Sequence, residues 1–183
     1  MGKFANATYM TLDGDVQNVF DWHFDYLGEE ADRAVTAQLF TSDAVIMGRA
    51  TYDSFSEAWP PRVGTSQIAD RMDSIKKYVI SSTLVDPKWN NTTVISDNVV
   101  EEVRKIKEEG NLLQFGYGAV TRLLLANGLL DELRIWLHPV LSGKAKPTDL
   151  IYRDADQTRF TLDGVETHRN GIIILTYRPT NAA

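Results

Sequence analysis

The stretch AVIMGRATY at residues 44–52 decides the fold class. Residues 44–47 form a short apolar run, which predicts a buried strand because a helix needs about ten or more residues. Gly48 follows at once, and a helix is expected near residues 50–58. A buried strand that passes through glycine into a helix is typical of a parallel β-α-β unit.

The same alternation of strand and helix runs through the rest of the chain. Upstream, a strand is predicted at residues 4–12, an irregular aromatic segment at 16–28 and a helix at 29–40. Downstream, strands are predicted at residues 77–80, 92–95, 112–115 and 133–141, and helices at 66–75, 99–108 and 119–126. Strands at 159–166 and 172–177 close the chain as a hairpin. The sequence therefore predicts one α/β domain over residues 1–183, with flanking helices, a mixed but mostly parallel central sheet and a C-terminal antiparallel hairpin.

The composition excludes several classes of function. The chain of 183 residues has a formal net charge of −6 and no cysteine. An acidic chain binds phosphate backbones and anionic membranes poorly, so we expect no nucleic-acid and no membrane partner. The lack of cysteine excludes thiol nucleophiles and cysteine-ligated metals, and we expect no metal site. The longest apolar run, residues 172–175, is too short to span a membrane, so a cytoplasmic protein is expected.

Three strand ends carry residues suited to an anionic ligand. Glycine lets the backbone approach a ligand, a helix N-terminus offers free N–H groups, and arginine adds a forked cation. Each feature alone also has a structural interpretation, because glycine solves turns and hydroxyls cap loops. Together, at successive strand ends, they favour one anion-binding crevice. The residues are Gly48, Arg49 and Thr51; then Ser81, Ser82 and Thr83; then Gly116, Tyr117, Gly118 and Ala119.

These segments, in this order, carry a resemblance to a known family. The motifs are TLDG (11–14), VIMGRATY (45–52), WP (59–60), VISS (79–82), GYG (116–118), GLLDELR (128–134) and HPV (138–140). Together they resemble the dihydrofolate-reductase-like fold. The most similar branch includes the reductase half of the bacterial riboflavin-pathway deaminase–reductase and its stand-alone relatives. The similarity extends from about residue 4 to residue 178.

The resemblance implies an NADPH-dependent reductase. In such an enzyme Gly48, Arg49 and Thr51 would hold cofactor phosphates, and the hydroxyls of residues 81–83 would lie near the adenosine end. Gly116, Gly118 and Ala119 would cradle the pyrophosphate. Tyr117 departs from the family pattern, because relatives often have a small residue there. The tyrosine either covers the cofactor or hinders it.

The candidates for substrate binding and proton supply are fewer. Thr11 and Asp13, at the first strand end, would border the nicotinamide and the substrate. Asp32 stands 16 residues before Gly48, the offset of the substrate-binding carboxylate in dihydrofolate reductases. An acid at a helix start is equally explained by the helix dipole. Trp22 either lines a planar substrate or packs against its own domain. Asp32, Asp13 and an ordered water remain alternative proton donors.

We therefore expect an oxidoreductase that transfers hydride from NADPH to a C=N or C=O group of a small polar, pterin- or pyrimidine-like substrate. The alternative is a catalytically idle nucleotide-binding protein that retains the fold. NADPH is expected over NADH because Arg49 offers a fork for the 2′-phosphate, whereas NAD sites favour an acid there. A homodimer is also expected, because the apolar strand at residues 133–137 and the C-terminal hairpin need covering.

Overall fold

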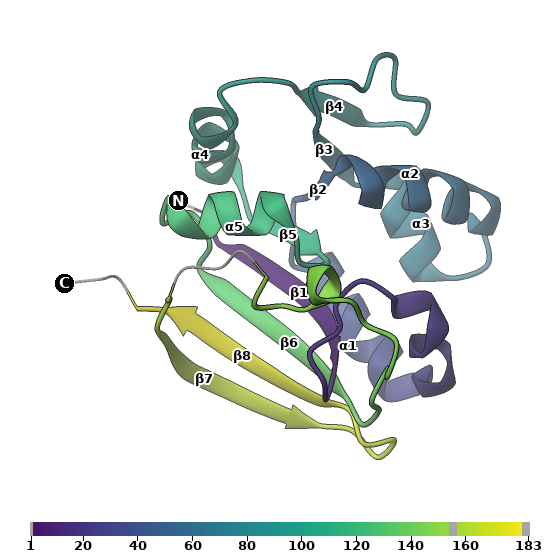
Figure 1. The fold of residues 1–183 in the computed structure, drawn as a ribbon. Helices are drawn as coiled ribbons and strands as arrows, with labels where there is room; N and C mark the ends of the chain where they lie inside the picture. The colour runs from purple at the N-terminus through teal and green to yellow at the C-terminus, as the bar shows by residue number, and fades with distance from the viewer. Residues whose placement is uncertain (1, 154–156, 181–183) are drawn as a thin grey trace.

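Eight strands form a single sheet in the order β4-β3-β2-β5-β1-β6-β8-β7 (Figure 1). The computed structural model describes residues 2–153 and 157–180. In chain order the elements are β1 (Phe4–Thr11), the 3-10 turns η1 (Val19–Asp21) and η2 (His23–Tyr26), α1 (Glu29–Phe40), β2 (Ala44–Gly48), α2 (Arg49–Ala58), η3 (Pro60–Arg62), α3 (Gln67–Ser74), β3 (Lys76–Ile80), β4 (Thr92–Ile95), α4 (Val99–Glu109), β5 (Leu112–Phe115), α5 (Ala119–Ala126), β6 (Glu132–His138), η4 (Pro147–Asp149), β7 (Phe160–Thr167) and β8 (Ile173–Pro179).

The strand directions confirm the predicted mixed sheet. The five neighbouring pairs from β4 to β6 are parallel, whereas β8 runs antiparallel to both β6 and β7. Short parallel strands need a helix to return the chain to the same edge. As a result, the carboxyl ends of β3, β2, β5, β1 and β6 all lie at one edge of the sheet.

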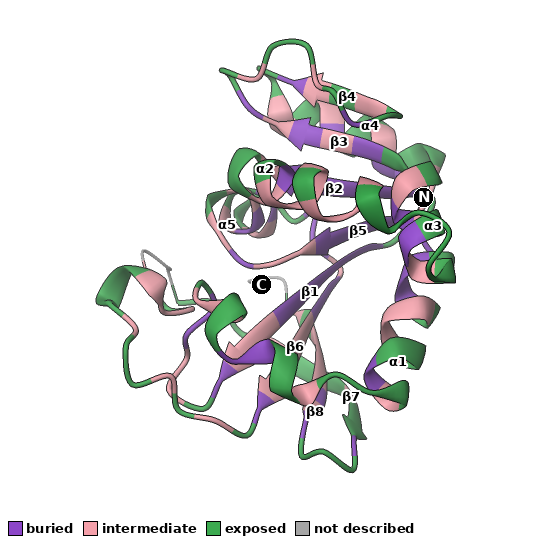
Figure 2. Ribbon diagram, turned by 90° about the vertical axis from the view of Figure 1, so that its right-hand side faces the viewer, coloured by how far each residue is buried: buried purple, intermediate pink, exposed green. Residues whose placement is uncertain are grey.

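Helices cover both faces of the parallel part of the sheet. On one face, Leu39 of α1, Tyr52 of α2 and Met72 of α3 pack with strand residues such as Val45 and Leu113. On the other face, Val103 of α4 and Leu124 of α5 complete a second apolar cluster. Figure 2 shows the result: β2 and β5 are largely buried, and β7 is mostly exposed.

Strand β6 differs from its prediction in length and position. It ends at His138 rather than residue 141, because Pro139 follows and has no N–H for a ladder hydrogen bond. It lies inside the sheet, between β1 and β8, so it is not an edge in need of covering. That part of the argument for a dimer was wrong. The edge strands are β4 and β7, and on β7 the side chains of Leu162 and Val165 are 50% and 56% exposed.

Candidate functional site

The three predicted junctions meet at the carboxyl edge of the sheet. Gly48 pairs with Ile80, the last residue of β3, and Phe115 at the end of β5 pairs with Ala7 of β1. Ligands of open α/β sheets bind outside this edge. The fold therefore collects the candidate residues from three distant segments into one region.

The N-terminus of α2 opens directly from Gly48. No side chain caps this helix end, so its first N–H groups are free to bind a ligand. A Cβ atom on Gly48 would lie 3.3 Å from a methyl carbon of Val120, in the first turn of α5. The lack of a side chain thus lets the N-termini of α2 and α5 approach each other. Two helix N-termini side by side form a strong anion site.

The glycine loop before α5 leaves its backbone accessible. Gly116 has φ +79°, a left-handed conformation that favours glycine. A Cβ atom on Gly116 or Gly118 would meet no heavy atom within 4 Å. Gly118 is extended at φ −167°, which any residue adopts, so nothing in its backbone demands glycine. The Gly116 and Gly118 N–H groups already donate, to the Ala7 carbonyl at 2.9 Å and to the Thr121 hydroxyl at 3.2 Å. The open space beside the two glycines therefore gives a phosphate group access to the Tyr117 N–H and to the first turn of α5.

A buried polar network under this loop fixes its shape. The Asn6 side-chain amide donates to the Gln114 side-chain oxygen at 3.0 Å and to the Gly116 carbonyl at 2.7 Å. The Thr121 hydroxyl donates to the same Gln114 oxygen and accepts from the Gly118 N–H at 3.2 Å. The sequence analysis missed this network. Its signal was a set of polar residues inside strands expected to be buried.

The Tyr117 side chain packs into the core. It is 9% exposed and belongs to the apolar cluster that includes Leu124 and Leu133. Burial raises the pKa of its phenol above the usual value. Only the backbone of Tyr117 faces the loop that follows β1, where its carbonyl accepts from the Gln17 side chain at 2.9 Å. The tyrosine thus fills the core under α5.

Arg49 pairs with a surface carboxylate, which is the structural alternative to a role in phosphate binding. Its Nε donates to both carboxylate oxygens of Asp53, at 2.7 and 2.9 Å, one helical turn along α2. Both side chains are about half exposed, and exposed pairs of this kind are weak. Both bonds to Asp53 come from Nε, so the two terminal nitrogens of the guanidinium remain able to bind a phosphate.

The three hydroxyls after β3 divide into two roles. Ser81 is only 9% exposed. Its hydroxyl accepts from the backbone N–H groups of Thr83 and Leu84 at 3.2 and 3.1 Å. It therefore shapes the turn, as serine does in many loops. Ser82 and Thr83 are exposed beside it.

The Asp13 carboxylate binds the loop that follows β6. Its carboxylate accepts from the Thr11 hydroxyl and from the N–H groups of Ser142 and Gly143 at 3.0 and 3.1 Å. These bonds, that from Thr11 first, hold the pKa of Asp13 well below its usual range. A carboxyl that stays ionised cannot supply a proton. The geometry thus argues against Asp13 as the acid, and gives Asp13 and Thr11 the task of positioning the loop after β6.

Asp32 lies in the first turn of α1 with an exposed side chain. It lies close enough to Tyr9 of β1 to affect that phenol: burial, and then the negative charge of Asp32, raise the pKa of Tyr9 above its usual range. Tyr9 is therefore neutral and able to donate a hydrogen bond. The sequence analysis missed Tyr9, because a tyrosine in a strand reads as ordinary core.

Two histidines far apart in sequence form a pair beside Tyr9. Nδ1 of His138 lies 2.8 Å from the Trp136 carbonyl, which can only accept, so this nitrogen carries the proton. Its Nε2 then accepts from Nδ1 of His23 at 3.1 Å. Burial, and then the neighbouring His138, lower the pKa of His23 to about 4. The His23 ring stacks on Tyr9 at 4.2 Å, so the pair fixes Tyr9 in place.

Two kinds of feature are absent from the described residues, 2–153 and 157–180. No group of three or more His, Cys, Asp or Glu side chains there is arranged to hold a metal ion. No helix in the same ranges is long and apolar enough to cross a membrane.

The fold defines an α/β protein whose sheet has a glycine-containing loop at its carboxyl edge. The RibD C-terminal domain family matches residues 5–174. The uncharacterized protein YyaP of Bacillus subtilis (strain 168) is 28% identical over 175 residues, which cover 92% of this chain and 90% of YyaP. The chain belongs to the RibD C-terminal domain family, which confirms the resemblance seen in its motifs.

Solved structures show the same fold. A putative riboflavin biosynthesis protein from Shewanella sp. PV-4 superposes with a TM-score of 0.73 at 17% identity, covering 98% of this chain and 99% of the other. A diaminohydroxyphosphoribosylaminopyrimidine deaminase/5-amino-6-(5-phosphoribosylamino)uracil reductase from Thermotoga maritima superposes with a TM-score of 0.68 at 14% identity. The superposition includes 98% of this chain and 57% of the Thermotoga protein. The chain thus has the fold of these proteins over nearly its whole length.

Proposed function

We propose that this protein is an NADPH-dependent reductase that transfers hydride to a C=N or C=O carbon of a small polar, pterin- or pyrimidine-like substrate. The observation that carries the proposal is the approach of two helix N-termini, those of α2 and α5, at one edge of the sheet. Gly48 permits this approach, and the open glycine loop at residues 116–118 completes it. Family membership supports the reductase class.

The residues present fit a dinucleotide phosphate. The free N–H groups at the start of α2, and the backbone of the glycine loop, would bind pyrophosphate oxygens. The terminal nitrogens of Arg49 would bind the 2′-phosphate, with Ser82 and Thr83 exposed nearby. Bound NADPH supplies the hydride, and the protein's task is to orient the substrate and exclude water.

The chain also offers a route for the proton. The charge of Asp32, in the first turn of α1, acts on the phenol of Tyr9, near the carboxyl end of β1. Tyr9 stays protonated, so it would donate a hydrogen bond to the substrate, and the exposed Asp32 would exchange protons with solvent. The stacked His23 holds the phenol in position.

Binding and turnover can be tested separately. NADPH is titrated while its fluorescence is followed, and its oxidation is then measured with a panel of pterins and ribityl-pyrimidines. Saturable binding with turnover of one panel member is expected. Binding without turnover across the panel would favour an idle nucleotide-binding protein. That alternative has lost its main support, because Tyr117 packs in the core. The lack of any NADPH binding would refute the proposal.

A further inference from the structure

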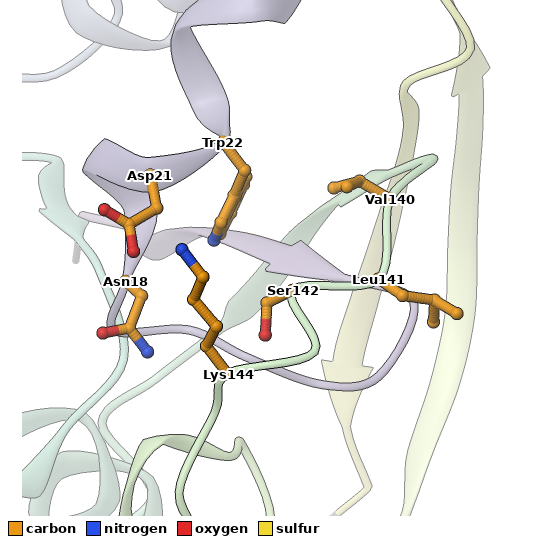
Figure 3. A pocket seen from close by; sticks show the side chains of 7 residues that line it. All are labelled: Asn18, Asp21, Trp22, Val140, Leu141, Ser142 and Lys144. Carbon is orange, nitrogen blue, oxygen red and sulfur yellow. The ribbon is translucent and has the colours of Figure 1, made fainter.

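A small pocket lies where the loops after β1 and β6 face each other. Its volume is about 150 Å³, and it is lined by Asn18, Asp21, Trp22, Val140, Leu141, Ser142 and Lys144 (Figure 3). Sites for whole ligands are typically about 300–1,000 Å³. This pocket therefore has room for one functional group of a larger molecule.

Trp22 places an unpaired donor in this pocket. The residue is 5% exposed, and its Nε1 has no acceptor among the described residues. Figure 3 shows this nitrogen turned into the pocket. The ring cannot easily turn away, because it packs edge-on against His138 at 4.8 Å. Buried N–H groups almost always have an acceptor, so we expect a ligand in this pocket to place an acceptor atom beside the Trp22 nitrogen.

Two charged groups reach the same space from opposite sides. Figure 3 shows the Lys144 ammonium directed toward the indole nitrogen of Trp22, and the Asp21 carboxylate lies on the other side of that ammonium, where it lines the same pocket. The other polar side chains are already engaged, because the Asn18 amide donates to Asp15 at 3.0 Å and the Ser142 hydroxyl donates to Asp13 at 3.4 Å. The pocket therefore presents two donors, Trp22 and Lys144, and one anionic acceptor, Asp21.

This pattern discriminates between ligand groups. A carboxylate or phosphate would satisfy the two donors but would meet the negative charge of Asp21. A carbonyl oxygen next to an N–H group satisfies all three: the oxygen accepts from Trp22 and Lys144, and the N–H donates to Asp21. Such an edge occurs in amides, lactams and ureides.

We propose that this pocket binds a neutral amide-type edge, C(=O)–NH. The pocket lies near the glycine loop: Asn18 lines the pocket, and its neighbour Gln17 donates a hydrogen bond to the Tyr117 carbonyl in that loop. As an extension that rests on the proposed function, the pocket holds the amide edge of the substrate while the rest of the molecule reaches the cofactor. Binding of the edge itself requires neither cofactor nor turnover.

Indole N–H signals provide the test. The chain has 4 tryptophans, so a ¹⁵N–¹H spectrum of the labelled protein holds four indole signals, and Trp22→Phe identifies one of them. Titration with 2-pyrrolidone is expected to move the Trp22 signal downfield. The Trp136 indole also has no acceptor within residues 2–153 and 157–180 but is fully enclosed, so its signal should stay fixed. N-Methyl-2-pyrrolidone keeps the carbonyl but lacks the N–H, and should bind about tenfold more weakly.

Two lysine variants test whether 2-pyrrolidone binds in the pocket or elsewhere on the same loop. Lys144→Gln is expected to weaken 2-pyrrolidone binding about tenfold. Lys146→Gln, on the same loop but outside the pocket, should leave it unchanged. If 2-pyrrolidone does not move the Trp22 signal, there is no amide site. If acetate moves it at lower concentration than 2-pyrrolidone, the pocket is an anion site and the proposal is wrong. Either failure leaves the NADPH titration untouched, so the proposed function is judged separately.

Discussion

Replacing Gly118 with alanine separates cofactor binding from stability. A Cβ atom at this position meets no heavy atom within 4 Å, and the backbone is extended at φ −167°. The substitution therefore brings no clash and no backbone strain, and only the change of N-cap residue costs stability, about 1 kcal/mol or less. If the glycine loop cradles a pyrophosphate, however, the new methyl group occupies the approach to the ligand.

The size of the binding effect follows from the contacts that the methyl group would block. A hydrogen bond to a charged group contributes about 1.5–3 kcal/mol, so the loss of one backbone contact weakens NADPH binding about tenfold or more. The dissociation constant is measured by fluorescence titration, and the free energy of unfolding by urea denaturation.

Two other glycines serve as controls for this substitution. Gly116→Ala forces alanine into φ +79° and should cost about 1–2 kcal/mol of stability as well as affinity. Gly128→Ala imposes comparable strain at φ +65°, beyond the C-terminal end of α5, and should leave NADPH affinity unchanged. If Gly118→Ala binds NADPH as tightly as the wild type, the phosphate cradle does not lie at this loop.

Three further predictions concern stability and assembly. The pKa of His23, about 4, lies below the ordinary value of 6.5, so as the pH falls the unfolded chain takes up a proton before the folded protein does. The free energy of unfolding should therefore fall by about 3 kcal/mol as the pH drops from 6.5 to 4. Urea denaturation at several pH values in this range should show the fall, and His23→Phe should abolish most of it. Lys77→Met leaves three backbone carbonyls without their donor and should destabilise the protein by about 2–4 kcal/mol; an unchanged urea midpoint would contradict this. We also propose a homodimer through the apolar face of β7, so light scattering should give twice the chain mass of 20.6 kDa, and Leu162→Glu should halve it; a monomeric wild type would refute the dimer.

Local patterns in the sequence were sufficient to predict most of the fold. Apolar runs bounded by glycine and polar turns gave α1, β4, β5 and α5 with the bounds that the structure has. The position of β6 could not be obtained in this way, because strand order depends on contacts between distant segments. A proline after His138 was the available signal for its true end.

The candidate site was predicted in part, for a physical reason. Glycines and helix starts leave local signals, so Gly48 and the loop at residues 116–118 were found from the sequence. The pairing of His23 with His138, 115 positions apart, leaves no such signal. The bonds that commit Asp13 to the loop after β6 are equally non-local.

The central claim, an NADPH site at the carboxyl edge of the sheet, is tested most directly by cofactor affinities. The dissociation constants of NADPH and NADH are measured for the wild type, for Arg49→Ala and for Arg104→Ala, an exposed arginine on α4 that serves as the control. The wild type should prefer NADPH about a hundredfold, from two charge-assisted hydrogen bonds to the 2′-phosphate. Arg49→Ala should lose most of that preference by weakening NADPH alone, and the control should retain it. Equal affinities for the two cofactors in the wild type, or an unchanged NADPH affinity in Arg49→Ala, would contradict the account.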